Sequence, residues 1–128
     1  MKKVMKAGDV IYARTHAEFL NEAFGTNYKA LMKCVWKYGE WTVWMVRFNE
    51  IHGGWKNTFL SDSRIMEENL DKVGVWNSNP IENIDKKKIV VEIKELGNTR
   101  KYICRGRFIY DEENSSPYTV RYYNKYSD

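Results

Sequence analysis

The sequence predicts an α+β domain built on a mainly antiparallel, strongly curled sheet with two or three short helices. Three observations lead to this class. The chain of 128 residues has the size of one domain, residues 1–128, with room for a single modest core. Its β-rich segments are interrupted by helical patterns, with no internal repeat and no dividing linker. About six twisted strands favour a sheet that curls into a partial barrel over one that stays open.

The C-terminal third predicts a three-stranded meander, around which the other elements are arranged. Two β-rich runs, 87–96 and 99–110, flank Gly97-Asn98, a strong signal for a tight antiparallel turn. A third run, 118–125, follows a polar turn. Strand alternation divides the bulky residues of the middle run between two buried faces. One face would carry Tyr102, Cys104, Phe108 and Tyr110, and the other Ile103 and Ile109.

The N-terminal part predicts a short strand and two helices. Residues 10–13 read as a strand with few polar positions. Thr15 and Glu18 match a capping box for a helix that ends before Gly25. Apolar residues then recur at helical spacing and predict a second helix over 27–39. The recurring residues are Tyr28, Leu31, Met32, Val35 and Trp36.

The middle of the chain predicts a pair of strands and a third helix. Residues 40–48 are β-branched and aromatic on both faces, and residues 55–60 read as the returning strand. Ser61-Asp62-Ser63 offers capping residues for a short acidic helix that ends near Leu70. Residues 74–85 have no clear periodicity, and binding residues concentrate in loops of this kind.

The distribution of charge says more than the net charge of +4. Lys and Arg outnumber Asp and Glu by seven to four in residues 1–40, and are outnumbered by seven to four in 41–85. In 86–127 they lead by ten to five. A basic C-terminal sheet after an acidic middle permits a polyanionic partner, although charges on a half-solvated sheet also serve solubility alone.

The sequence shows no pattern typical of a metal site, a cofactor site or a membrane-spanning segment. Cys34 and Cys104 are seventy positions apart, and neither belongs to a Cys/His cluster with His16 or His52. We therefore expect no metal and no cofactor, and two thiols buried in a reduced core. The basic N-terminus precedes no apolar run of signal-peptide length, and no run approaches a membrane span. We expect a cytoplasmic protein of undetermined oligomeric state.

One pattern allows catalysis. Glu92 and Lys94 lie two apart after an apolar run, hence on one face of a strand. Metal-dependent nucleases use such a pair, the carboxylate to hold a divalent cation and the lysine to position the attacking water. Asp71 or Asp85 would supply the further acid. An ordinary alternating strand explains the same pattern, so a non-enzymatic role is favoured.

Aromatic residues beside cations favour binding. Trp55 and Trp76 fall in or beside loops, and tyrosines including Tyr123 crowd the last strand next to Arg121. Rings stack on bases while Arg and Lys neutralise phosphates. The alternative is that these rings cover the core.

The run Arg100 to Phe108, followed by a polar turn and Val120-Arg121-Tyr122-Tyr123, resembles the closing strands of PUA-like and SRA-like domains of restriction-associated proteins. The resemblance covers the C-terminal third. It implies a curled sheet that presents a pocket and a basic rim to nucleic acid, and in SRA members a flipped, often modified base held between aromatic rings.

These observations assign candidate roles for binding a flipped base. Stacking falls to Trp55 or Trp76, the base edge to Asn57 or Asp62, and phosphates to Arg105, Arg107 and Arg121. Tyr123 is a further candidate for contact with nucleic acid. The alternative is a small non-catalytic accessory or inhibitor protein of a microbial or viral defence system, binding a protein or a nucleotide-like ligand through the same exposed rings.

Overall fold

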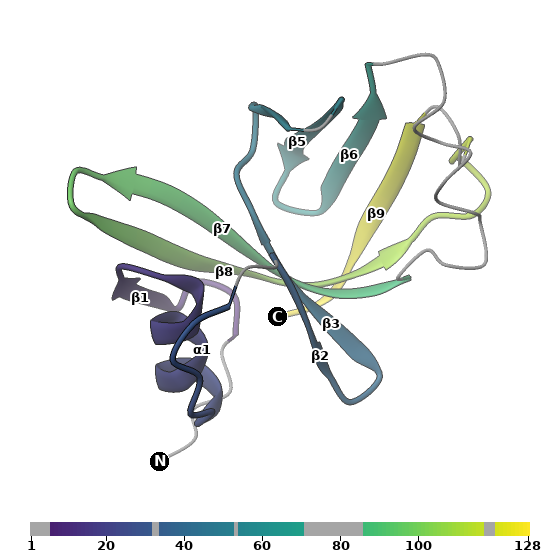
Figure 1. The fold of residues 1–128 in the computed structure, drawn as a ribbon. Coiled ribbons are helices and arrows are strands. Elements are labelled where there is room, and N and C mark those ends of the chain that lie inside the picture. The colour runs from purple at the N-terminus through teal and green to yellow at the C-terminus, as the bar shows by residue number, and fades with distance from the viewer. Residues whose placement is uncertain (1–5, 32–33, 53, 71–85, 117–119) are drawn as a thin grey trace.

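The computed structural model describes residues 6–31, 34–52, 54–70, 86–116 and 120–128. These form one short helix and a large sheet (Figure 1). In chain order the elements are β1 (Val10–Ala13), α1 (His16–Phe24), β2 (Val35–Tyr38), β3 (Trp41–Val46), β4 (Ile51–His52), β5 (Trp55–Ser61), β6 (Arg64–Asn69), β7 (Lys87–Leu96), β8 (Thr99–Tyr110) and β9 (Val120–Ser127). Within the described ranges no helix is long and apolar enough to cross a membrane.

The sheet is open. Its strand order is β2-β3-β7-β8-β9-β6-β5-β4, with β1 paired to β8 off this path, so β2 and β4 are the two ends of the order. The strongly curled partial barrel expected from the sequence is therefore wrong. Pairing is antiparallel except between β3 and β7. Because β4 pairs over two residues only, it offers too short an edge for a ladder that would close the sheet.

The α+β class with two or three helices is wrong as well, because two predicted helices are strands. The helix expected over 27–39 is replaced at its C-terminal end by β2, which pairs with β3 from Val35↔Trp44 to Tyr38↔Trp41. Gly39, with φ 63°, makes the turn between them instead of ending a helix. A short run of apolar residues fits the spacing of a helix as well as that of a strand. Here the pairing with β3 makes the segment a strand.

The acidic helix expected after Ser61 is β6, the second strand of a hairpin with β5. Ile65 pairs with Phe59 on one side and with Tyr123 on the other, and is fully buried. Residues 64–69 alternate in the structure, so their polar side chains divide between two faces.

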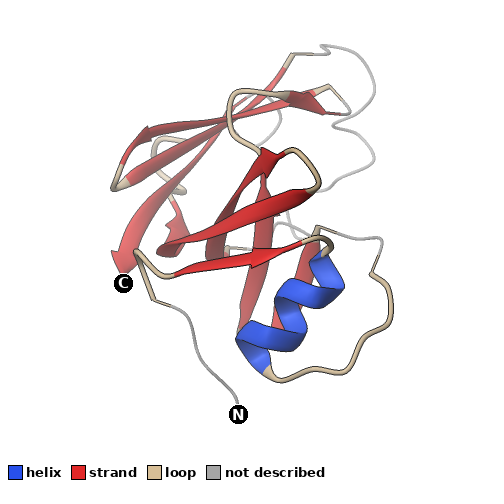
Figure 2. Ribbon diagram, turned by 90° about the vertical axis from the view of Figure 1, so that its left-hand side faces the viewer, coloured by secondary structure: helices blue, strands red, loops and turns tan. Residues whose placement is uncertain are grey.

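The helix α1 forms where the sequence predicts it. The Thr15 hydroxyl accepts a hydrogen bond from the backbone N–H of Glu18 at 3.1 Å, and Gly25 ends the helix with φ 71°. The ring of Phe19 stacks on Tyr102 of β8 with centroids 4.5 Å apart. The helix thus lies against one end of the sheet (Figure 2).

Two apolar clusters lie on opposite faces of β3 and β7, since adjacent residues of these strands divide between them. The helix-side cluster holds Val43, Met45, Ile89, Val91, Phe19, Leu20, Tyr102 and Cys104 among others. The inner cluster, bounded by β5, β6 and β9, holds Trp44, Val46, Phe48, Ile65, Val90, Phe108, Tyr110 and Tyr123.

A β-bulge explains how β8 serves both clusters. Val90 pairs with Gly106 and Val91 with Cys104, so Arg105 is the extra residue. The bulge reverses the alternation, and Cys104 faces the helix while Phe108 faces the inner cluster. The predicted grouping of Tyr102, Cys104, Phe108 and Tyr110 on one face is therefore wrong.

Candidate functional site

A row of polar side chains crosses three strands of the inner face. Asn57 of β5 pairs with Glu67 of β6, which pairs with Arg121 of β9. Trp55 and Asn69 form the next pair along the same face. We call these five residues the inner pocket.

One residue of the inner pocket is buried, and the other four are half-buried. Arg121 is 3% exposed, and its Nη1 lies 3.9 Å from Oε1 of Glu67. The guanidinium carbon of Arg121 lies 4.8 Å from the ring centroid of Trp55, a cation–π contact. Neighbours on two strands therefore hold this charge in place.

Two buried acceptor atoms of the inner pocket are left without hydrogen bonds in the described part of the chain: Oδ1 of Asn57 and Oε1 of Glu67. A buried acceptor without a hydrogen bond costs roughly 1–3 kcal/mol. Such atoms in native proteins call for an explanation, and a bound ligand that donates hydrogen bonds is one.

Apolar packing supports the pocket on one side. Tyr123 follows Arg121 on the same face, is 1% exposed, and packs at 6.0 Å from the ring of Trp44. Nζ of Lys88 lies 4.0 Å from the ring centroid of Trp44 and 4.5 Å from that of Tyr123. Burial raises the pKa of the Tyr123 phenol, so this residue stays neutral and serves the core.

A small cavity of about 100 Å³ reaches Asn57 from the side of β3. Its lining includes Trp44, Val46, Arg47, Glu50 and Asn57. This volume is well below the roughly 300–1,000 Å³ of sites for drug-sized ligands, and Asn57 is the one inner-pocket residue in its described lining.

The structure brings together three of the predicted site residues, namely Trp55, Asn57 and Arg121. Tyr123 adjoins them but is part of the core, and Trp76 lies outside the described residues. Asp62 and Arg105 line a separate cavity of about 260 Å³.

The predicted arginines do not form one basic face. Arg105 donates from Nε to Oε1 of Glu92 at 2.9 Å and lies over the ring of Phe59. Arg107 lies over Trp41, whose neighbours belong to the helix-side cluster. Arg121 is buried. The three guanidinium groups thus point to three different places.

Sequence reasoning missed Glu67 and Asn69. Both fall in the acidic helix that the sequence predicts after Ser61, and in a helix their side chains would not align with Asn57 and Arg121. The alternation of Ile65, Glu67 and Asn69 was the available signal, because it continues the apolar face of a strand into a polar end.

The residues proposed for a nuclease are arranged differently. Glu92 and Lys94 share a strand face, but the Glu92 carboxylate accepts two hydrogen bonds from Arg105. Asp71 and Asp85 lie outside the described residues. Within the described ranges no three His, Cys, Asp or Glu side chains are grouped to hold a metal ion.

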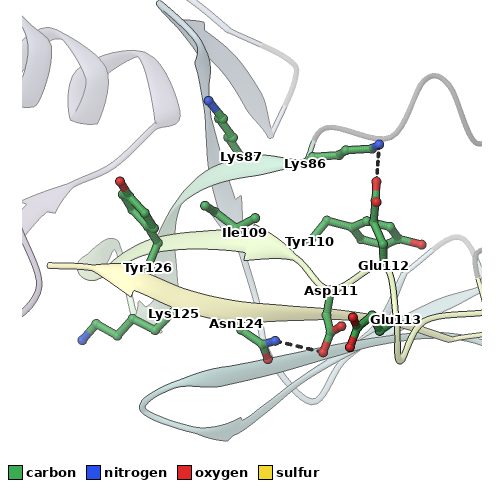
Figure 3. Close-up of a pocket in the computed structure, with 10 residues that line it drawn as sticks. All are labelled: Lys86, Lys87, Ile109, Tyr110, Asp111, Glu112, Glu113, Asn124, Lys125 and Tyr126. Atoms are coloured by element: carbon green, nitrogen blue, oxygen red, sulfur yellow. Dashed lines mark hydrogen bonds and ion pairs between the residues drawn. The ribbon is translucent and has the colours of Figure 1, made fainter.

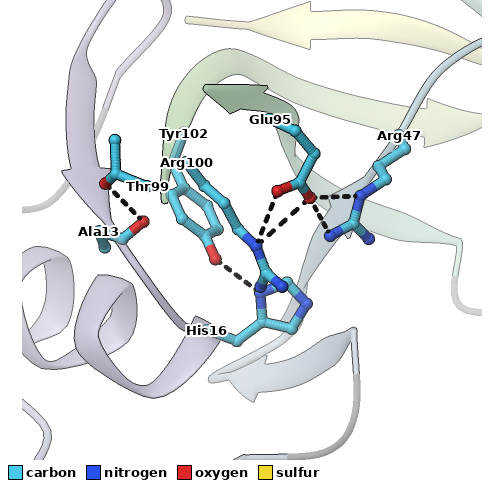
Figure 4. Close-up of polar contacts among 7 residues, drawn as sticks. All are labelled: Ala13, His16, Arg47, Glu95, Thr99, Arg100 and Tyr102. Carbon is cyan, nitrogen blue, oxygen red and sulfur yellow. Dashed lines mark hydrogen bonds and ion pairs between the residues drawn. The ribbon is translucent and has the colours of Figure 1, made fainter. Parts of the chain in front are cut away.

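A second polar cluster, shown in Figure 4, joins α1 to the β7–β8 hairpin. Nδ1 of His16 lies 2.9 Å from the Tyr102 hydroxyl. Arg47 donates two hydrogen bonds to Glu95, which also pairs with Arg100. Burial, together with Arg100 and Arg47, lowers the pKa of His16 to about 4. A neutral imidazole held in this way fastens the helix to the sheet.

Comparison with known proteins gives a family and a similar solved structure. The family model described as the SET and RING associated domain, abbreviated SRA, matches residues 1–128. The resemblance seen in the last third is therefore confirmed, and it extends along the whole chain. No curated protein sequence matches.

The solved structure of the 5-hydroxymethylcytosine-specific restriction enzyme AbaSI is similar to this chain, with a TM-score of 0.72 at 19% identity. The match covers 94% of this chain and 39% of AbaSI, so the chain spans well under half of that enzyme's length. At this identity the likeness concerns the fold.

Proposed function

The chain belongs to the SRA domain family, and from this premise we propose that it binds DNA and holds one flipped base in the inner pocket. The expectation of a nucleic-acid partner agrees with the DNA binding of SRA domains. The proposal requires a site that offers a flipped base hydrogen bonds for its pairing edge and a ring for stacking.

The observation that carries the proposal is the pair of buried acceptors, Oδ1 of Asn57 and Oε1 of Glu67. Oδ1 of Asn57 is open to a donor from a ligand, and so is Oε1 of Glu67, which faces Nη1 of Arg121 at 3.9 Å without a hydrogen bond. The exocyclic amino group of cytosine or adenine is such a donor, and carboxylates are the usual acceptors for the amine of cytosine. Guanine and thymine present carbonyl oxygens at the corresponding position, which a carboxylate repels.

Trp55 and Arg121 supply the remaining interactions. The Trp55 ring offers a stacking surface for the base, and the guanidinium beside it donates hydrogen bonds to a carbonyl oxygen. Cytosine carries an amine and a carbonyl on the same edge. Among bases with an amine, we therefore propose cytosine or a modified cytosine. AbaSI is, by its name, specific for 5-hydroxymethylcytosine, which is consistent with this choice.

The test compares two matched substitutions on β6, Glu67→Gln and Glu68→Gln. Both remove one negative charge, but adjacent residues of a strand face opposite sides. Loss of a negative charge by itself strengthens DNA binding through general electrostatics. If Glu67 accepts from the base amine, its substitution instead weakens binding by roughly 1–3 kcal/mol, or about 5- to 150-fold.

The measurement is fluorescence anisotropy with labelled duplexes whose central base is cytosine, 5-methylcytosine, 5-hydroxymethylcytosine or thymine, at two salt concentrations. Circular dichroism of each variant checks folding. We expect Glu68→Gln to bind as tightly as the parent protein or more tightly. Equal affinities for the two variants, with no dependence on the central base, would refute the base pocket.

A further inference from the structure

The helix-side face of the sheet has an uncovered end that the inner pocket does not use. There the start of β7 adjoins the second half of β8, with Lys87 paired to Ile109 and Ile89 to Arg107. Ile89 faces the helix-side cluster, so Lys87, Arg107 and Ile109 share that side of the sheet. In Figure 3 the side chains of Lys87, Ile109 and Tyr126 rise from the sheet on the same side.

Four residues at this end form what we call the outer shelf: Trp41, Lys87, Arg107 and Tyr126. The rings of Trp41 and Tyr126 have centroids 5.9 Å apart. The guanidinium carbon of Arg107 lies 4.8 Å from the Trp41 centroid, and Nζ of Lys87 lies 6.0 Å from it. Two cations therefore lie at the ring of Trp41, which adjoins the ring of Tyr126.

The outer shelf is accessible and carries available positive charge. Tyr126 is 65% exposed. A shallow hollow of about 540 Å³ lies over the outer shelf, Glu40 and Ile109. Oε1 of Glu40 forms an ion pair with Nζ of Lys87 at 3.8 Å. Arg107, by contrast, makes no ion pair within the described part of the chain. Its guanidinium makes a cation–π contact with the Trp41 ring.

We infer that the outer shelf binds an unpaired nucleotide, with the base stacked on the exposed Tyr126 ring and the phosphate at Arg107 and Lys87. Rings interleaved with cations are the arrangement that single-stranded nucleic acids recognise. An acidic peptide would use the cations but not the rings. Because the outer shelf and the inner pocket lie on opposite faces of the sheet, one nucleotide cannot occupy both, and this inference does not depend on the proposed function.

The test titrates the full chain into a short fluorescein-labelled oligo(dT) at low salt. Tyr126→Ala removes the stacking ring from an exposed position, and Arg107→Ala removes the phosphate contact. Tyr12→Ala is the matched control, since Tyr12 is an equally exposed tyrosine, 61%, on β1. We expect each shelf substitution to weaken binding by about tenfold, and Tyr12→Ala to leave it unchanged.

Four competitors identify the ligand. Competition by thymidine monophosphate supports a site for free nucleotides, and competition by unlabelled oligo(dT) alone supports a strand as the source. Competition by polyglutamate or by an abasic oligonucleotide as strong as that by oligo(dT) would overturn the stacking role of Tyr126. Parental affinity in both shelf variants would overturn the site.

Glu67→Gln separates this site from the inner pocket. It does not weaken oligo(dT) binding at the outer shelf, whereas Tyr126→Ala leaves the preference among duplexes with different central bases unchanged. A failure of one site is thus distinguishable from a failure of the other.

Discussion

Replacing Gly106 by alanine tests the bulge that organises both faces of β8. Gly106 has φ +106°, a conformation that residues with a side chain rarely adopt. A Cβ at this position would lie 2.8 Å from the backbone oxygen of Ser127 and 3.1 Å from Cε of Lys125. The lysine can move, but the Ser127 oxygen belongs to β9 and moves only with the strand.

Two contributions set the expected loss in the free energy of unfolding of Gly106→Ala. The backbone conformation alone costs an alanine about 1 kcal/mol. Overpacking against a strand that must shift costs a further 1–3 kcal/mol, roughly. Gly97→Ala is the matched control, because Gly97 also has positive φ, +69°, but open space around its Cβ position. We therefore expect losses of about 2–4 kcal/mol for Gly106→Ala and about 1 kcal/mol for Gly97→Ala.

Urea unfolding followed by tryptophan fluorescence measures both free energies, with the slope of each transition as a check on two-state behaviour. Equal losses in the two variants would mean that the contact with Ser127 is relieved without cost. The account of Gly106 as a fixed close contact between the bulged strand β8 and β9 would then be wrong.

Three further predictions concern the helix and the thiols. Because the pKa of His16 falls from 6.5 in the unfolded chain to about 4 in the folded one, the unfolded state binds more protons between these values, and the free energy of unfolding decreases as pH falls from 6.5 to 4. After allowance for the partial exposure of the ring we expect a loss of about 1–2 kcal/mol, measured by urea titrations across this range. An equal pH dependence in His16→Gln would contradict it. Thr15→Ala removes the cap on Glu18 N–H and should cost about 1 kcal/mol, whereas Thr15→Ser should cost much less in the same assay. Cys34 is exposed, while Cys104 is buried with its pKa raised by burial, so an aromatic disulfide reagent at neutral pH should titrate one thiol in the native protein and two in urea; rapid reaction of two native thiols would contradict this placement.

Elements whose sequence signals lie within a few residues are predicted correctly, whereas elements that depend on a distant partner strand are not. The hairpin at Gly97 and the helix capped by Thr15 are both confirmed, since Leu96 pairs with Thr99 and Glu18 donates to the cap. Each depends on residues a few positions apart. The β2 strand depends on Trp44, whose position in the sheet no local pattern reports.

The same distinction holds for the inner pocket. Trp55 and Arg121 could be predicted because an aromatic ring near a loop and a cation on a tyrosine-rich strand are chemical signals in themselves. That they meet at 4.8 Å follows from the β5-β6-β9 order. The helical assignment of residues 64–69 removed the strand that joins them, and Glu67 with it.

The bulge in β8 changes how Arg105 and Arg107 must be tested by substitution. Two residues apart, they would share one face of a regular strand, and a double alanine substitution would test one basic surface. The bulge instead directs Arg105 to Glu92 and Phe59 and Arg107 to Trp41. The double variant would therefore disturb a partly buried ion pair and the outer shelf together. Single substitutions separate the two effects: Arg105→Ala should act on the free energy of unfolding, because it leaves the Glu92 carboxylate shielded without its partner, whereas Arg107→Ala should act on affinity for single strands.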